Sequence, residues 1–211
     1  MRLTPLLASL VFAGVAAAVP VQDEIKVTTR RPVLAVVEQL RQRHGWRISY
    51  EDDALAGAEP YVLAFSYPAA SSEPTAVLQR LVTAHAALGQ GAFRVEESIA
   101  ALHIVPSAGS VLDTKVTLHT DATSPRDVVE AVCLAVSGAS GRRVIAGRVA
   151  VIHSRRVPVR GEGEPARAVL TRALAEFDAP LAWDLIYSPE LGGYILTAQR
   201  LFVVTSGRRS H

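Results

Sequence analysis

The chain has 211 residues and a formal net charge of +2, because 22 basic residues nearly balance 20 acidic ones. This balance lacks the clustered positive charge that nucleic-acid-binding proteins need, so no nucleic-acid partner is expected. Nearly half of the residues (49%) are hydrophobic, which supports a packed core and excludes a largely disordered chain.

The first 18 residues have the pattern of a secretory signal peptide. Arg2 supplies a positive charge, an apolar run covers residues 6–19, and Ala16 to Ala18 form an A-x-A cleavage site. The apolar run is shorter than the roughly 20 residues that a membrane-spanning helix requires, which disfavours the alternative of a membrane anchor. The sequence therefore predicts cleavage after about Ala18 and a periplasmic or secreted protein that is not integral to a membrane.

After the signal, one order of elements occurs four times. Each unit has a strand, a polar turn, a proline and an amphipathic helix, and then returns to extended structure. Proline suits the first turn of a helix because the N–H that it lacks would be unpaired there. The prolines that mark the four helix starts are Pro32, Pro74, Pro125 and Pro165.

Two of the units also predict β-hairpins. The strands 92–95 and 101–105 are joined by a turn near Glu97 and Ser98. The strands 143–145 and 149–152 are joined by a turn at Gly147. The last unit closes with strands at 183–187 and 194–197.

The pattern Trp-x-(Ile/Leu)-x-Tyr follows the first and the last helix. It comprises Trp46, Ile48 and Tyr50 in one unit, and Trp183, Leu185 and Tyr187 in the other. Residues two apart on a strand point to one face, so each trio lines one side of its strand. Aromatic residues of a core are the favoured interpretation, and a platform on which a ligand stacks is the alternative.

These elements predict an α+β fold of two tandem small domains, each built from two β-α-β(β) units with helices packed on small mixed sheets. The domains are expected at residues 25–106 and 113–204, followed by a tail at 205–211. A short, turn-rich stretch at 107–112 serves as the linker. Pairing two units within each domain covers the apolar face that a single unit would expose.

The first domain resembles the short N-terminal module of secretins and TonB-dependent receptors. The resemblance is carried by the segment 44–50 (His-Gly-Trp-Arg-Ile-Ser-Tyr) with Leu55, by 76–82 (Ala-Val-Leu-Gln-Arg-Leu-Val), and by the hairpin 93–95 and 102–105. The second domain resembles the same module more weakly. The resemblance implies a periplasmic interaction domain with two helices set against small sheets. In those families the module precedes a channel or barrel, and this sequence contains neither, so a stand-alone role is expected.

The residue types that carry catalysis, metal binding or cofactor binding form no recognisable motif in this sequence. The six histidines show no zinc-site spacing, and neither a P-loop nor a dinucleotide fingerprint occurs. The acidic run at 51–53 is better explained as a solvated turn than as a calcium loop. Cys133 lies on the apolar stripe of a helix and is expected to be a small buried hydrophobe. The sequence therefore predicts neither an enzyme nor a cofactor.

Charge placement is the clearest candidate for a binding site. Six arginines and no acidic residue lie between Ser140 and Gly161, and they are Arg142, Arg143, Arg148, Arg155, Arg156 and Arg160. The first half of the mature chain (19–112) has 8 basic and 10 acidic residues, whereas the second half (113–211) has 13 and 10. The arginines are suited to an acidic protein face, an anionic lipid or a cell-wall polymer. The alternative is an ordinary solvent-exposed face of strands.

The resulting hypothesis is an exported, non-enzymatic protein–protein interaction or scaffolding module of the bacterial cell envelope, acting in secretion or surface signalling. Its partner, another envelope protein, would add a strand to an exposed sheet edge, for which 101–105 and 194–204 are the candidates. One alternative is a small-ligand-binding protein or hydrolase with a cleft between the domains, using His119 or His153 with Glu51 or Asp53. Another is self-association of the acidic first half with the basic second half.

Overall fold

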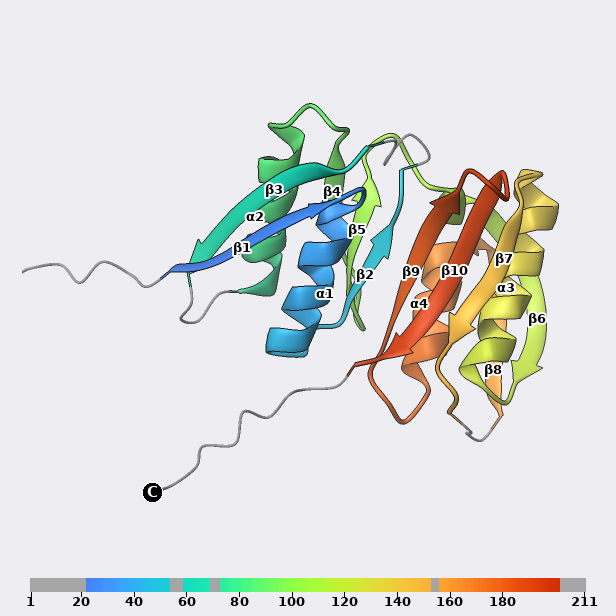
Figure 1. Ribbon diagram of the computed structural model, residues 1–211. Helices are drawn as coiled ribbons and strands as arrows, with labels where there is room; N and C mark the ends of the chain where they lie inside the picture. Colours follow the sequence, from blue (N-terminus) through green and yellow to red (C-terminus); the bar gives the residue numbers. More distant parts are fainter. Residues whose placement is uncertain (1–21, 54–58, 69–72, 153–155, 202–211) are drawn as a thin grey trace, which may run out of the picture.

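The computed structural model describes residues 22–53, 59–68, 73–152 and 156–201 (Figure 1). The predicted signal peptide and the tail at 205–211 lie outside these residues. Within them, four α-helices combine with three sheets, which confirms the α+β class. No helix in the described part of the chain combines the length and apolarity needed to cross a bilayer.

The first half contains β1 (Gln22–Thr29), α1 (Pro32–His44), β2 (Ile48–Glu51), β3 (Tyr61–Pro68), α2 (Pro74–Ala86), β4 (Phe93–Glu97) and β5 (Leu102–Pro106). A 3₁₀ turn, η1 (Val111–Asp113), ends the expected linker, and its Val111 and Leu112 are buried in the second-half core. The second half contains β6 (Lys115–Ala122), α3 (Pro125–Ser140), β7 (Val144–Val149), β8 (Val157–Pro165), α4 (Ala166–Ala175), β9 (Leu181–Ser188) and β10 (Gly193–Arg200).

Local signals explain where the helices begin and end. Three helices start on their predicted prolines, and α4 starts directly after Pro165. Ser124 and Asp127 form a capping box at the start of α3, which satisfies two backbone N–H groups that have no partner within the helix. Both α1 and α3 end at a glycine in the left-handed conformation, Gly45 and Gly141, which glycine adopts at little cost.

The two halves have the same order of elements and the same strand pairing. In the first half β5 lies between antiparallel β4 and parallel β2, and in the second half β10 lies between antiparallel β9 and parallel β7. Each half also has a two-stranded antiparallel sheet, β1–β3 or β6–β8. The three-stranded sets join through a parallel β2–β9 pair into one six-stranded sheet with the order β4-β5-β2-β9-β10-β7.

The two helix pairs cover opposite faces of the six-stranded sheet (Figure 1). Tyr50 on β2 is opposite Asp184 on β9, and side chains in register point to the same face. On that face Tyr50 belongs to the core of the first half, and Asp184 bonds to Arg41 of α1. The next pair points the other way, because Leu185 belongs to the core of the second half. The halves therefore lie side by side along the sheet, one turned over relative to the other.

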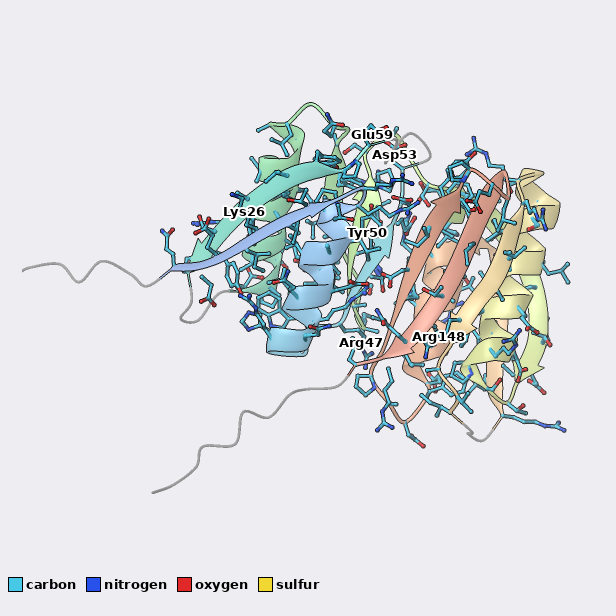
Figure 2. The ribbon with its side chains drawn as sticks, viewed as in Figure 1. Lys26, Arg47, Tyr50, Asp53, Glu59 and Arg148 are labelled. Atoms are coloured by element: carbon cyan, nitrogen blue, oxygen red, sulfur yellow. The ribbon has the colours of Figure 1, made fainter. Side chains whose placement is uncertain are left out.

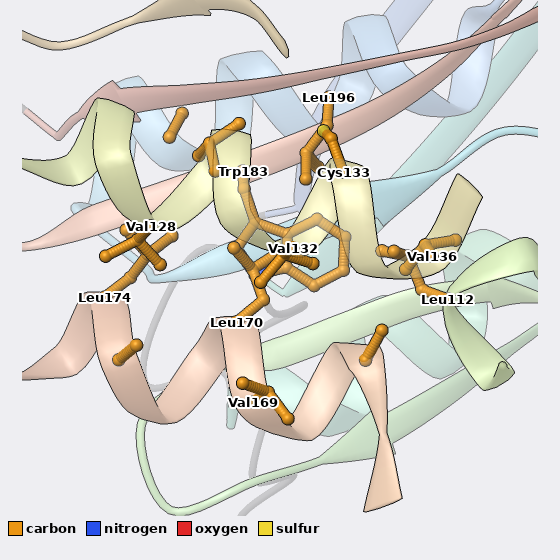
Figure 3. Packing of buried hydrophobic residues seen from close by; sticks show 14 of the residues in the cluster. Leu112, Val128, Val132, Cys133, Val136, Val169, Leu170, Leu174, Trp183 and Leu196 are labelled. Atoms are coloured by element: carbon orange, nitrogen blue, oxygen red, sulfur yellow. The ribbon is translucent and has the colours of Figure 1, made fainter. Parts of the chain in front are cut away.

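Each half has its own hydrophobic core between its helices and its sheets. In the second half, Trp183 lies among side chains of α3 and α4, including Val132, Cys133 and Leu170 (Figure 3). Burial raises the pKa of the Cys133 thiol to about 12, as suits a small hydrophobe rather than a nucleophile. The prediction of core aromatics is confirmed for Trp183 and Tyr50. The other two, Trp46 and Tyr187, are only partly buried.

One of the two predicted hairpins is confirmed and the other is wrong. The strands β4 and β5 form the first, in antiparallel register. The second does not form, because β7 runs straight through Gly147 and pairs with β10, with a bulge between Leu196 and Ala198. A Cβ on Gly147 would lie 2.5 Å from Cγ2 of Ile195. Glycine is therefore needed at this position for close strand packing rather than for a turn.

A second close approach predicts the effect of adding one methyl group. A Cβ on Gly193 would lie 2.5 Å from the carbonyl oxygen of Arg143, whereas a Cβ on Gly138 of α3 would meet nothing within 4 Å. We expect Gly193→Ala to lower the free energy of unfolding by about 1–3 kcal/mol, as overpacking does. The control Gly138→Ala is expected to raise it by up to about 1 kcal/mol, because alanine favours helix. Urea titrations measure both, and equal effects would contradict the packing.

Candidate protein-binding site

The two halves meet where β2 pairs with β9, and we call this contact the joint. On the face of the sheet that α1 covers, Arg41 links the two halves across it. This side chain is 3% exposed, although it lies on α1. Its Nη1 and Nη2 donate to the two carboxylate oxygens of Asp184 on β9, at 3.1 and 2.6 Å, and its Nε donates to the carbonyl oxygen of Ile48 at 2.8 Å. A bidentate pair of this kind fixes the angle as well as the distance between helix and strand.

On the other face Arg167 has the corresponding role. It extends from α4 and donates to both carboxylate oxygens of Glu51 on β2, which is fully buried. It also bonds to Glu96 on β4 at 2.9 Å and forms an ion pair with Asp113 at 2.8 Å. Burial raises the pKa of the Glu51 carboxyl, and the hydrogen bonds from Arg167 act in the opposite direction. Each half therefore contributes one arginine that binds a carboxylate of the other half, and we call these two ion pairs the arginine clamps.

A third polar cluster, centred on Asp52, lies at the end of the contact between the halves. The Arg31 side chain donates to Asp52 at 2.7 Å and to the carbonyl oxygen of Tyr187 at 2.6 Å. The Tyr50 hydroxyl donates to the same Asp52 carboxylate at 2.9 Å, and the Tyr187 N–H donates to it at 3.1 Å. The acidic run at 51–53, interpreted from the sequence as a solvated turn, thus contributes two buried carboxylates to the contact between the halves.

The ring of His103 on β5 stacks on the ring of Trp183 on β9. Their ring centroids lie 5.5 Å apart, and the His103 side chain is buried. Burial, followed by the positive charge of Arg167, lowers the pKa of His103 to about 4. His103 is therefore a neutral part of the packing at pH 7.

Of the residues suggested for a small-ligand cleft, Glu51 and His119 do not come together. Glu51 is bound by Arg167, whereas His119 is exposed on β6, in a different sheet. His153 lies outside the described residues. No group of three or more His, Cys, Asp or Glu side chains within the described ranges could hold a metal ion.

The predicted binding edges are wrong. The strand β5, which contains 102–105 of the predicted edge at 101–105, lies between β4 and β2. The strand β10, which contains 194–200 of the predicted edge at 194–204, lies between β9 and β7. Both are interior because each returns from a hairpin to pair in parallel with the first strand after the first helix of its half. The outermost strands of the six-stranded sheet, within the described residues, are β4 and β7.

The candidate arginines divide between two places. Arg142 and Arg143 immediately precede β7, Arg148 lies within it, and all three are exposed. Arg156 and Arg160 are exposed at the start of β8, which belongs to the β6–β8 sheet. Arg155 lies outside the described residues. Three of the six arginines thus flank one of the two actual edges of the large sheet, and we call β7 with these three residues the basic edge.

An open groove of about 870 Å³ lies beside the basic edge. Residues of α1 line it on one side and residues of β7, β9 and β10 on the other, among them Arg148, which is labelled in Figure 2. Charged side chains from both halves line it, including Glu38, Arg41, Asp184 and Arg148. Burial, and then the Asp184 charge, raise the pKa of Glu38.

Sequence reasoning missed Arg41, Arg167 and Asp184. A signal was present for the two arginines, because each continues the buried stripe of its helix. Arg41 follows Val33 and Val37 at intervals of four, and Arg167 precedes Leu170 and Leu174 at helical spacing. An arginine in such a stripe indicates a buried acidic partner. Which acid it binds depends on a strand pairing that no local pattern encodes.

Comparisons of the chain with protein-family models, curated proteins and solved structures gave no match.

Removal of Arg167 should destabilise the protein strongly. Arg167→Leu leaves Glu51 buried without its cation, and we expect a loss of about 3–5 kcal/mol in the free energy of unfolding. The double variant Arg167→Leu, Glu51→Leu should recover much of the loss because no buried charge remains. The control Arg172→Leu, on the same helix as Arg167, removes an exposed ion pair with Glu164 of β8 and should cost less than about 1 kcal/mol. Denaturant titration measures the stability of the three variants, and equal losses for Arg167→Leu and Arg172→Leu would contradict the buried Arg167–Glu51 pair.

Stability should also depend on pH through His103. In the folded protein its pKa is about 4 and in the unfolded chain about 6.5, so the stability that it contributes is present above pH 6.5 and lost as the pH falls towards 4. His103→Phe removes this dependence. We expect the difference in unfolding free energy between wild type and variant to shift by about 3 kcal/mol between pH 7 and 4. A difference that stays constant would show that His103 is not buried as described.

Proposed function

We propose that this chain is a non-enzymatic protein-binding module of the bacterial cell envelope, periplasmic or secreted, which binds an extended segment of a partner at the basic edge. The observation that carries the proposal is the position of β7, the outermost strand of a six-stranded sheet, with three exposed arginines beside it. An outermost strand offers backbone groups that a partner strand can pair with.

The backbone of β7 shows which groups are available. The Tyr194 N–H donates to the carbonyl oxygen of Arg143 at 2.8 Å, so Arg143 faces β10. Because successive strand residues face alternate sides, the N–H and carbonyl groups of Val144 and Ala146 point away from β10. Both groups of Val144 are already bonded to the Ser137 hydroxyl, at 3.0 Å each, so a partner strand beside β7 would bond to those of Ala146.

The arginines indicate the chemistry of the partner segment. Arg142 and Arg143 lie at one end of β7 and Arg148 lies near the other, where it also lines the groove. Asp and Glu side chains of an added strand would meet these cations along its length, which favours an acidic segment and increases its rate of association. The segment's side chains that point towards α1 would enter the groove.

The repeated architecture supports two tandem small domains that resemble the short N-terminal module of secretins and TonB-dependent receptors. Each half has the same order of elements and its own core, as the resemblance implies. A role in secretion or surface signalling is an extension of that resemblance.

Site-specific photo-cross-linking in envelope extracts tests the proposal. A benzoylphenylalanine at position 148 should capture a distinct partner, and one at the exposed position Thr117 on β6 should not. Ala146→Pro removes an outward N–H and should reduce capture by at least about tenfold, as expected from losing one or two backbone bonds. Ala146→Ser keeps the N–H and should not reduce capture. Capture that survives Ala146→Pro, or that is equal at both positions, would contradict strand addition at β7.

A further inference from the structure

We propose that the segment that pairs with β7 is strand β4 of a second copy of this chain, so that copies join head to tail into one continuous sheet. This inference rests on the proposed function, because it assumes strand addition at the basic edge, and it names the partner. It is carried by the pairing that the molecule already makes between its own halves.

The internal joint is made by the strands that correspond to the two free edges. By element order and pairing, β7 of the second half corresponds to β2 of the first, and β4 of the first half corresponds to β9 of the second. The strands β2 and β9 pair in parallel within the chain. Their counterparts β7 and β4 are the two outermost strands of the sheet, at its opposite ends.

The correspondence extends to single residues. The helix before each strand ends at a left-handed glycine, Gly45 or Gly141. The residue four positions earlier donates to the first strand residue: Arg41 to the carbonyl oxygen of Ile48 at 2.8 Å, and Ser137 to that of Val144 at 3.0 Å. The residue before each strand accepts from the neighbouring strand, Arg47 from Leu102 and Arg143 from Tyr194. Residues 48–51 therefore correspond to 144–147, up to the bulge of β7.

This alignment predicts the register between copies. Within the chain, Tyr50 is opposite Asp184 and Glu51 is opposite Leu185. The pairing of β9 with β10 and of β4 with β5 makes Asp184 the counterpart of Arg94 and Leu185 the counterpart of Val95. Between copies, Ala146 of one chain should therefore lie opposite Arg94 of the next, with Gly147 opposite Val95.

The backbone of β4 suits this register. The Ala92 carbonyl oxygen accepts from Ser107, and the Ser98 N–H donates to Ala101, so even-numbered residues of β4 face β5. The backbone N–H and carbonyl groups of Val95 therefore point away from β5, because successive residues of a strand alternate. Within the chain Leu185 faces β2 in the same way, because its carbonyl oxygen accepts from the Asp52 N–H at 2.8 Å. The correspondence of β7 with β2 ends before Arg148, because β7 has one extra residue between Ala146 and Val149 where it pairs with β10.

The geometry gives an open chain of copies rather than a closed pair. The two surfaces are different strands, so each copy uses β7 for one neighbour and β4 for the other, which is a heterologous contact. The second half is turned over relative to the first, with its helices on the opposite face. A further step of the same kind returns the next copy to the orientation of the first, so the sheet can continue.

Charge favours the contact, and the missing clamps limit its strength. In this register Arg148 of one copy lies near Glu96 and Glu97 of the next, whereas Arg142 and Arg143 lie beyond the other end of β4. The strand β4 also carries Arg94, and Glu96 already pairs with Arg94 and Arg167 of its own chain. The positions that correspond to Arg41 and Arg167 are Ser137 and Thr75, so the contact between copies lacks the two arginine clamps of the internal joint. Association should therefore be reversible, concentration-dependent and weakened by salt.

Cross-linking between two single-cysteine proteins tests the register. Ala146→Cys and Arg94→Cys are made separately in a Cys133→Ala background and treated with a short bis-methanethiosulfonate reagent. The mixture should give a covalent dimer, either protein alone should give at least about tenfold less, and one chain carrying both cysteines should give a ladder. A parallel set that keeps the buried Cys133 covers a failure of the background to fold. Val95→Pro on the Arg94→Cys partner, which removes an outward N–H of β4, should abolish the product, and Thr117→Cys in place of Arg94→Cys should give none.

Sedimentation of the cysteine-free protein gives the second measurement, in which the mean mass should rise with concentration and fall with added salt. A protein that remains monomeric and gives no 146–94 product would overturn head-to-tail pairing. The proposed function would then still stand if position 148 captured a different protein in a manner sensitive to Ala146→Pro. If neither product formed, both proposals would fail.

Discussion

The six-stranded sheet depends on a short parallel contact between β2 and β9, and that contact depends on charged side chains. The ladder itself involves only two residue pairs, Tyr50 with Asp184 and Glu51 with Leu185. So few backbone bonds would not hold two cores together against the conformational freedom that they restrict. Arg41 and Arg167 add a buried, bidentate ion pair on each face of the sheet. Each arginine comes from a helix of one half and binds a strand of the other.

These clamps also specify the arrangement of the halves. A buried carboxylate without a cation is costly, so Glu51 and Asp184 disfavour any register that separates them from their arginines. Apolar side chains would tolerate small slips of one strand along the other. The charges therefore select one register, which is the role for which buried ion pairs are best suited.

Local sequence signals predicted the elements well but not their neighbours. Helix starts follow from proline and capping residues such as Ser124, whose effects extend over only a few positions. The hairpin of β4 and β5 is likewise local. The position of β5 inside the sheet was not predictable in this way, because it depends on a return to β2 across more than 50 residues. Gly147 was misinterpreted because a glycine that permits a turn and one that permits close packing look the same in a sequence. Of the candidate arginines, three lie at β7, whereas Arg160 belongs to a different sheet, because nearness in the sequence does not determine which sheet a residue joins.

The distance along the chain between β2 and β9 has a consequence for the order of folding. Ser49 and Trp183, which bond across the joint, are 134 positions apart, so the first half is made long before its neighbour strand exists. Contacts of such long range form late in folding. During this interval β2 is a free edge. It ends at Glu51, which is followed by Asp52, and the charges of these residues deter pairing with a strand of another chain, as edge charges do in other sheets. We expect the same carboxylates to act first as gatekeepers in the nascent protein and later as ligands of Arg167 and Arg31. Pulse-labelled hydrogen exchange that found the Asp52 amide protected before the second half had folded would contradict this order.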